Sequence, residues 1–302
     1  MMSGVLSTII VILIMIFLGY FLKRIQLLNI KDIDVLNKLV INVAMPCLIF
    51  SSLYSADLSN MIALAIMPMI NVVVATISGL IVFTILTFKN YSKERKWGAV
   101  VPVVIGNTAF LGFPMVLGVF GQSALVKAIF YDMGTLMMFL SLSVILMINF
   151  GGTLKEVVKR ILSFPILWAV IIGISFNLLN IPIGEIASNL IGYLSAAAIP
   201  VIMISLGISL RFKGIFRNLN MVSLSVIVKL LIAPIIALIL VNIIGLSGIE
   251  SNIAVTEAAM PSGMLTLILA AMYKLDFNLA ADCTIVTTIF SLITLPIIIG
   301  II

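Results

Sequence analysis

The sequence contains no histidine and only two cysteines, and 9% of its residues are charged. Without histidine, the chain has neither a zinc-hydrolase ligand set built on imidazole nor a histidine proton relay. Cys47 and Cys283 both lie inside apolar runs, so they do not indicate a disulfide framework. A soluble domain carries roughly 25% charged residues. The scarcity of charge therefore argues against a soluble fold.

Long apolar runs are what the sequence has in abundance. Hydrophobic residues make up 63% of the 302 residues, and the mean hydropathy is +1.35. We expect an all-α polytopic membrane protein in contact with the lipid bilayer, because a helix of ~20 apolar residues crosses it. Ten runs of this kind are found, at about 4–22, 35–54, 61–88, 98–120, 124–149, 164–180, 186–210, 221–245, 252–273 and 278–301.

The charged residues between these runs predict the orientation of the chain. Lysine and arginine follow the odd-numbered runs, whereas the other connections carry acidic residues and no base, apart from Lys127 just inside the fifth run. Because cytoplasmic loops are enriched in Lys and Arg, we expect both termini outside the cytoplasmic membrane. The net charge of +6 then reflects topology and does not indicate a nucleic-acid partner. The basic residues of these connections are Lys23, Arg24, Lys31, Lys89, Lys93, Arg95, Lys96, Lys155, Lys159, Arg160, Arg211, Lys213, Arg217 and Lys274.

Two of the apolar runs are interrupted by residues that do not favour a continuous helix. The fourth run contains Gly106, Asn107, Thr108, Gly112 and Pro114, and the ninth contains Glu257 followed by Met260-Pro261-Ser262-Gly263. A broken backbone at membrane depth must be buried in protein or line a wet cavity. Two such segments, one in each half of a chain, are the best sequence indication of a transporter binding site.

The two halves of the chain also resemble each other. Five runs lie in residues 1–150 and five in 164–302, with a polar connector at 151–163 that is long enough for a short surface helix. The same number of residues separates Gly19 from Pro46 and Gly173 from Pro200. Asn107 and Asp132 are likewise spaced as Glu257 and Asp282. With an odd number of spans in each half, the second repeat would be inverted relative to the first.

In their order along the chain, these motifs resemble the auxin efflux carrier family, whose bacterial members are often called malate or organic-acid permeases. The resemblance covers nearly the whole length. It implies an inverted five-plus-five repeat whose fourth and ninth helices break and cross at mid-membrane, an architecture similar to that of bile-acid/sodium symporters. It also implies that Asn107 and Glu257 line ion or substrate sites. The motifs are Asn42 to Pro46, Gly106 to Pro114, Ala196 to Leu210 with Pro200 and Gly207, Glu257 to Gly263, and Ser291 to Pro296.

Polar and kink-forming residues at the interruptions are the candidate substrate site. Asn107 and Thr108 suit an anion at the start of a half-helix, although they could instead only cap it. The prolines could equally be packing kinks. The candidate substrate-binding residues are Asn107, Thr108, Gly112, Pro114, Met260, Pro261, Ser262, Gly263, Pro46, Pro200 and Lys229.

The intramembrane charges are candidates for coupling. A carboxylate at the helix centre costs ~2.5–3.5 kcal/mol on insertion scales, so Glu257 is expected to face a cation, water or a partner, or to be protonated and hydrogen-bonded. Asp132 and Asp282 are further candidates, unless they reach the membrane surface. Na⁺ at Glu257, Asn107 and Asp132, or a proton on one of the acids, are both open. Lys229 is expected to contact either Glu257 or an anionic substrate.

We therefore expect a secondary transporter of a small organic anion, a carboxylate such as malate or an auxin-like acid, that works by elevator-type alternating access. No organic cofactor and no enzymatic activity are expected. Na⁺ symport, proton coupling and uniport stay open, as does a homodimer. The alternatives are a passive channel and an intramembrane aspartyl protease using Asp132 and Asp282. The Gly-x-Gly-Asp signature expected of such a protease is absent from both aspartates.

Overall fold

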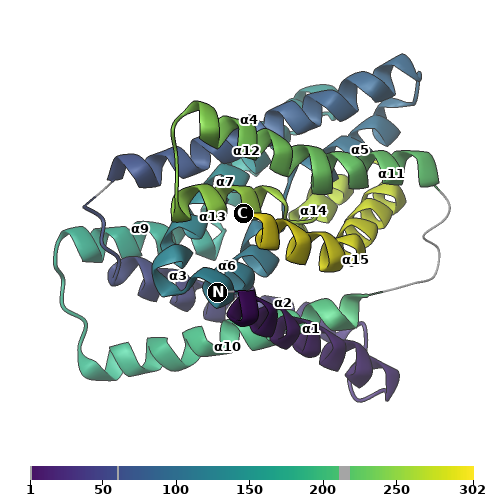
Figure 1. Ribbon diagram of the computed structural model, residues 1–302. Coiled ribbons are helices and arrows are strands. Elements are labelled where there is room, and N and C mark those ends of the chain that lie inside the picture. Colours follow the sequence, from purple (N-terminus) through teal and green to yellow (C-terminus); the bar gives the residue numbers. More distant parts are fainter. Residues whose placement is uncertain (1, 60, 211–217) are drawn as a thin grey trace. The chain divides into compact units, whose positions relative to one another are not determined.

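Helices account for every regular element that the computed structural model describes, over residues 2–59, 61–210 and 218–302 (Figure 1). Seven continuous helical stretches are long and apolar enough to cross a membrane, and a bent pair formed by α8 and α9 would make an eighth span. The predicted all-helical class is confirmed. Of the predicted cytoplasmic bases, Arg211, Lys213 and Arg217 lie outside the described residues. The seven stretches are Leu6–Arg24, Asp32–Tyr54, Ile62–Phe88, Gln122–Phe150, Glu185–Ser209, Leu219–Ile243 and Phe277–Ile301.

The helix boundaries follow the apolar runs closely, and the connector at 151–163 contains a short helix, α8. The helices, with π-helical turns written η, are α1 (Met2–Arg24), α2 (Asp32–Leu39), η1 (Val40–Ala44), α3 (Met45–Tyr54), α4 (Met61–Phe88), α5 (Lys93–Val104), η2 (Thr108–Gly112), α6 (Phe113–Phe120), α7 (Gln122–Phe150), α8 (Leu154–Leu162), α9 (Pro165–Leu178), α10 (Glu185–Ser209), α11 (Leu219–Ile227), η3 (Val228–Ile232), α12 (Ala233–Ile243), α13 (Ile249–Ala258), α14 (Leu265–Met272) and α15 (Phe277–Ile301).

Each of the three π-helical turns ends two residues before a proline. The prolines are Pro46, Pro114 and Pro234, after η1, η2 and η3 respectively. Proline has no N–H, and in an α-helix its ring clashes with the carbonyl four residues earlier. In each case the residue before the proline donates its N–H to the carbonyl five residues back instead of four. The wider turn relieves the clash and lets the helix continue through the proline.

The chain forms two compact units, and each contains helices from both halves of the sequence. Unit 1 consists of α1 to α3 with Leu117–Val126 and Val158–Leu210. Within it, α1 packs along α10 (Figure 1). A Cβ on Gly19 or Gly207 would lie less than 3 Å from the backbone of the facing helix. The absence of a side chain at these two glycines allows the close contact between the helices.

Helices α3 and α9 form the other close pair of unit 1. The Nδ2 of Asn177 lies 2.8–3.0 Å from the carbonyl oxygens of Leu53, Tyr54 and Ala56, at the end of α3. The last carbonyls of a helix lack partners within it. The amide of α9 therefore caps α3 and ties the two helices together.

Unit 2 contains Ile62–Val116, Lys127–Val157 and the helices from α11 to the C-terminus. Its apolar core gathers side chains from α4, α5, α7, α11, α14 and α15. Gly79 of α4 faces Val104 of α5 so closely that a Cβ would lie 2.5 Å from the valine Cγ2. Lys127, the one basic residue near the connections that otherwise carry only acidic charges, pairs with Glu250 at 3.4 Å.

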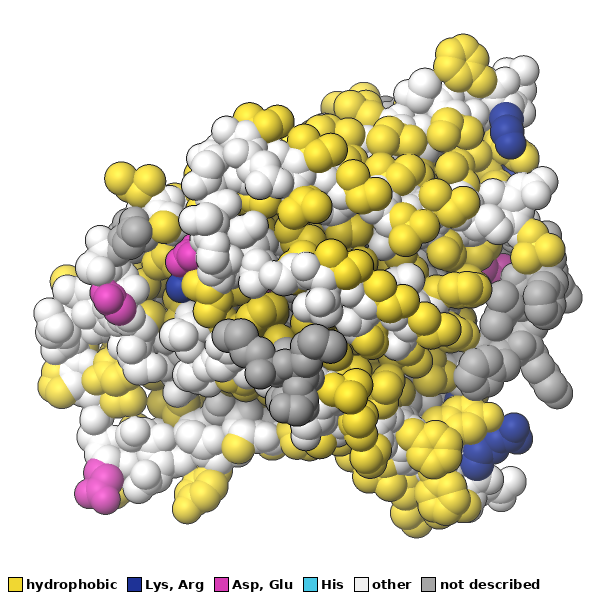
Figure 2. Space-filling view, viewed as in Figure 1, with side chains coloured by type: hydrophobic (Ala, Val, Ile, Leu, Met, Phe, Trp, Pro, Cys, Tyr) yellow, Lys and Arg dark blue, Asp and Glu magenta, His cyan; other side chains and the backbone are white. Residues whose placement is uncertain are grey.

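Hydrophobic side chains cover much of the visible surface of both units (Figure 2). Large apolar residues such as Ile62, Ile186 and Ile301 are more than three-quarters exposed. In water such a surface would cause aggregation, whereas in a bilayer it contacts lipid. The exposed surface thus agrees with the membrane location expected from composition.

Candidate functional site

The fourth predicted span is interrupted after α5. That helix is capped by Ser92, whose side chain accepts a hydrogen bond from the Arg95 amide, and it ends before Ile105. Ile105 has extended backbone angles, and η2 and α6 resume the helix at Thr108. Asn107 precedes this second piece, but its side chain makes no capping hydrogen bond. The reading of Asn107 as a helix cap is therefore wrong for its side chain.

The ninth predicted span is interrupted in the same manner after α13. The helix ends at Ala258, and α14 begins at Leu265. Between them lie Met260, Pro261, Ser262 and Gly263, all buried. Proline removes a helical N–H and glycine favours no fixed conformation, so the break falls where the sequence predicts it.

Backbone hydrogen bonds join the two breaks to each other. The Asn107 amide donates to the Pro261 carbonyl at 2.7 Å, and the Gly263 amide donates to the Ile105 carbonyl at 2.8 Å. Together they form a short antiparallel bridge between Gly106 and Ser262. Unpaired backbone groups are costly away from water. Each break thus satisfies groups that the other leaves without helical partners.

Glu257 is the most deeply buried charge beside the bridge. Its exposure is 0%, and neither carboxylate oxygen has a hydrogen-bond partner among the described residues. The space for this carboxylate exists because residue 112 is glycine: a Cβ there would lie 2.6 Å from Oε1. Burying a charge without partners is expensive. The site is therefore built for a positive charge or a proton at this carboxylate.

Lys229 is the only basic residue among the described residues that line the same buried space as Glu257. It belongs to η3 and is 5% exposed. A Cβ on Gly106 would lie 3.2 Å from its Nζ. Glu257 lies within electrostatic range of both Lys229 and Asp132. The two glycines of the first break thus face opposite charges, Gly106 the ammonium and Gly112 the carboxylate.

A directed chain of hydrogen bonds ends on Asp132. Thr108 donates to the Asp132 carboxylate, and the hydroxyls of Thr108 and Thr135 are 3.0 Å apart. Asn71 donates to the Thr135 hydroxyl at 2.9 Å and to the Tyr131 carbonyl at 3.0 Å. Since the single Thr108 proton goes to Asp132, Thr135 must donate to Thr108. The chain runs from α4 through α7 to η2 and holds Asp132 against the first break.

These polar groups enclose a cavity of about 10 Å³. That is close to the smallest space that holds one water molecule. It suits a water or a bare monovalent cation and is too small for an organic acid. The polar side chains that line it include Asn71, Ser78, Thr108, Thr135, Lys229 and Glu257.

The other predicted site residues fall into two groups. In unit 2, Ser262 donates its amide to the Thr287 hydroxyl at 3.2 Å, and its own Oγ is buried without a partner among the described residues. Pro114 is buried in α6. Asp282 lies partly exposed on α15 and is not among the residues lining the small cavity. Pro46 and Pro200 belong to unit 1, and Pro200 is exposed.

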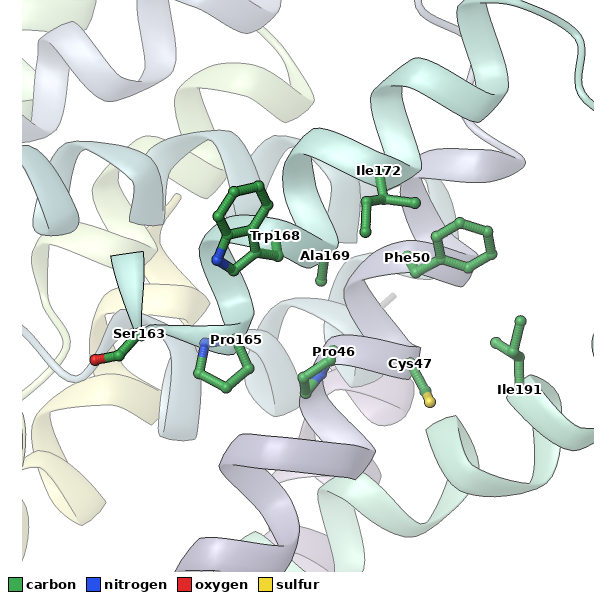
Figure 3. A pocket seen from close by; sticks show the side chains of 9 residues that line it. All are labelled: Pro46, Cys47, Phe50, Ser163, Pro165, Trp168, Ala169, Ile172 and Ile191. Carbon is green, nitrogen blue, oxygen red and sulfur yellow. The ribbon is translucent and has the colours of Figure 1, made fainter. Parts of the chain in front are cut away.

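Pro46 instead lines a groove of about 460 Å³ in unit 1, between α3, α9 and α10 (Figure 3). Pro165 and Ser163 lie at one end of it in Figure 3, and Trp168 and Phe50 lie along it. The lining carries no charged side chain. This groove therefore offers a carboxylate no positively charged partner among the residues that line it.

Several polar residues of the site were not predicted from the sequence. Asn71, Ser78 and Thr135 lie in long apolar helices, and each lines the cavity. Asn71 in particular is a buried amide in α4, and a polar side chain inside a predicted span was an available signal. The described residues contain no group of three or more His, Cys, Asp and Glu that could hold a metal ion. A sodium ion here would need hydroxyl, amide or carbonyl oxygens as well.

These features define a polytopic membrane protein in which two interrupted helices meet beside a buried charged cluster. The sequence matches the family model described as membrane transport protein over residues 4–299. The chain therefore belongs to this family of transporters, to which the auxin efflux carriers belong, and the resemblance drawn from its motifs is confirmed.

The chain is also similar to individual proteins. It is 41% identical over 293 residues to an uncharacterized transporter of Methanothermobacter thermautotrophicus, with 97% of each chain covered. It is 32% identical over 298 residues to an uncharacterized transporter of Methanocaldococcus jannaschii, with 96% of each covered. A probable auxin efflux carrier component 9 of Oryza sativa is 26% identical over 141 residues, which are 45% of this chain and 33% of that protein.

Proposed function

We propose that the protein is a secondary transporter that moves a small organic anion across the cytoplasmic membrane by alternating access. The observation that carries this proposal is the backbone bridge between the two helix breaks, beside a charged cluster of the buried Glu257 and Lys229 and the partly exposed Asp132. Membership of a transporter family supports it. Broken helices that meet near charged groups are the usual setting of transporter sites.

The full architecture that we propose has ten spans in an inverted five-plus-five repeat. The seven long helical stretches and the bent pair of α8 and α9 make eight spans, and these become ten when α5 with α6, and α13 with α14, each cross as a broken pair. In this arrangement the fourth and ninth spans cross at mid-membrane, and both termini face outside. The repeats are residues 1–150 and 164–302, linked by 151–163.

The substrate class that we propose is a carboxylate, such as malate or an auxin-like acid. The side-chain amide of Asn107, the Ser262 hydroxyl and the starts of η2 and α14 offer donors and partial positive charge. Thr108, whose hydroxyl donates to Asp132 in the state described, is a further candidate. The name of the rice relative, a probable auxin efflux carrier, supports an organic acid. The remaining candidates for the substrate path are Gly112, Pro114, Met260, Pro261, Gly263, Pro46 and Pro200.

The motion that we propose is of the elevator type. Unit 2 holds both breaks and the charged cluster, so it is the part that would carry the substrate, with unit 1 as scaffold. In the state described, the small cavity has no room for an organic acid. A change of conformation is thus needed before such a substrate can bind among these groups. A homodimer stays a prediction.

Counterflow in liposomes tests this proposal. Purified protein in vesicles preloaded with an unlabelled dicarboxylate, aromatic acid or amino acid should concentrate the same labelled solute transiently. A passive channel or an aspartyl protease acting through Asp132 and Asp282 would give no counterflow, since only a carrier exchanges solute in this manner. Absence of counterflow for every organic anion that stabilises the protein against heat would exclude the proposal.

The candidate residues for ion coupling are Glu257, Asp132, Asp282 and Asn107. The substitution Glu257→Gln distinguishes Na⁺ coupling, proton coupling and uniport. If Glu257 holds Na⁺, transport depends on sodium and Glu257→Gln abolishes that dependence. If it carries a proton, Glu257→Gln still exchanges substrate but no longer accumulates it under a pH gradient. In a uniporter, transport responds to neither gradient.

A further inference from the structure

Lys229 and Glu257 carry opposite charges into one small cavity but do not touch. Glu257 makes no hydrogen bond through either oxygen among the described residues, so Lys229 is not its direct partner. Both side chains line the same space of about 10 Å³. Gly106 makes room for the ammonium and Gly112 for the carboxylate, since a Cβ on either would crowd the charged atoms. The two charges thus line one cavity that has about the volume needed for a single water molecule.

A small cation beside Glu257 is the other way to balance this carboxylate. The cavity has the size for one, and the oxygens of Thr108, Thr135 and Asn71 lie around it. These are the hard oxygen donors that alkali and alkaline-earth cations prefer. A mobile cation placed there, however, would be repelled by the ammonium of Lys229, which is buried and so poorly screened.

We propose that Lys229 is a tethered counter-ion for Glu257, which occupies the electrostatic role of a bound Na⁺ and makes this site independent of sodium. Removing the charge of Lys229 turns the cavity into a monovalent cation site whose anchor is Glu257. As far as transport is concerned, the inference rests on the proposed function. Cation binding by the variants does not depend on it.

The cluster contains one further acid whose place in this balance is clear. Asp132 accepts the hydrogen bond from Thr108 at the end of the chain that begins at Asn71. It is partly exposed, unlike Glu257. Asp132 therefore has a hydrogen-bond donor of its own, whereas Glu257 has none among the described residues, and Lys229 is needed mainly by Glu257.

Thermal unfolding of the purified protein tests cation binding. The wild type, measured in sodium chloride and in choline chloride of equal concentration, should unfold at the same temperature. Lys229→Gln and Lys229→Ala should each show a saturable rise in melting temperature that is specific to sodium. Lys229→Arg keeps the charge and should behave as the wild type. The double variant Lys229→Gln/Glu257→Gln should lose the sodium response.

Counterflow of the transported anion adds a second readout. Wild-type exchange should be equal in sodium and choline, whereas Lys229→Gln should exchange only in sodium. If Lys229 instead contacts the substrate, Lys229→Gln loses exchange in both salts and gains no sodium-dependent stability.

Two results would overturn the inference. One is a sodium-specific stabilisation of the wild type, which can be measured even if a Lys229 variant does not fold. The other is a folded Lys229→Gln or Lys229→Ala variant whose melting temperature is the same in sodium chloride and in choline chloride. If the wild type exchanges no organic anion while Lys229→Gln still gains sodium-dependent stability, the proposed transport function fails and the tethered counter-ion stands.

Discussion

The amide of Gly263 donates a hydrogen bond of 2.8 Å to the carbonyl of Ile105, which joins the break after α13 to the break after α5. This contact leaves no space beside the glycine. A Cβ on Gly263 would lie 2.5 Å from the carbonyl oxygen of Gly106, which is backbone and unable to swing aside. The meeting of the two breaks therefore depends on a glycine at this position.

Gly263→Ala should separate the two breaks. Forcing a methyl group into a packed site typically costs about 1–3 kcal/mol, so the variant should melt at lower temperature and transport poorly. Gly300→Ala is the matched control, because Gly300 lies in α15 with nothing within 4 Å of its Cβ position. If Gly263→Ala melts at the same temperature as the wild type, the backbone bridge accommodates a methyl group and the prediction is wrong.

Gly112→Ala should act through Glu257. The new Cβ would lie 2.6 Å from the carboxylate Oε1, and a carboxylate at the end of a side chain can move. The variant should therefore fold but transport less than the wild type. In a Glu257→Ala background the same substitution meets no carboxylate and should not lower the melting temperature further. An equal loss in both backgrounds would contradict this coupling.

Asn107→Ala should weaken transport without unfolding the protein. The Asn107 side chain makes no capping hydrogen bond, and its backbone amide remains free to bond Pro261 after the substitution. If the side-chain amide binds the charged substrate, its loss costs ~1.5–3 kcal/mol, or roughly a 10- to 150-fold weaker apparent affinity in counterflow. An unchanged affinity in correctly folded protein would show that the Asn107 side chain does not bind the substrate.

Topology can be tested with single cysteines in a protein that lacks Cys47 and Cys283. Reporters at the exposed residues Ser55, Gly184 and Ser247 should react with a membrane-impermeant maleimide from outside the cell. Reporters at Asn29, Ser92 and Thr153, also exposed, should react only after lysis. Labelling of any two of these sites from the wrong side contradicts ten spans with both termini outside.

The fold was largely predictable because apolar runs of membrane length are a strong signal. The predicted run 61–88 matches α4, and the predicted interruptions fall where α5 and α13 end. The residues of these breaks were identified because glycine, proline and polar groups are conspicuous in an apolar run. The grouping of helices into two units depends on contacts between distant segments, which no local pattern reveals.

The charged residues of the site could be predicted from the sequence, but the polar residues that surround them could not. Glu257, Asp132 and Lys229 stand out because ionisable residues are rare in spans. Asn71, Thr135 and Ser78 resemble ordinary polar residues of a helix until packing brings them to one cavity. The helix-capping role considered for the Asn107 side chain is not observed, and the pairing of its backbone amide with Pro261 in the other break depends on the tertiary fold. Pairing of Lys127 with Glu250 likewise depends on the tertiary fold.

The π-helical turn η3 has a consequence for how insertions and deletions can occur in this chain. A loop closed by a hydrogen bond to the fifth residue back contains one residue more than an α-helical loop. Deleting one residue there would restore regular α-helical winding with little rotation of α12 relative to α11, because the wide turn is what takes up the extra residue. The deletion would instead shift the residues inside the turn, among them Lys229, relative to the cavity that they face. A single-residue gap in this segment of a relative should therefore accompany a different residue at the position of Lys229.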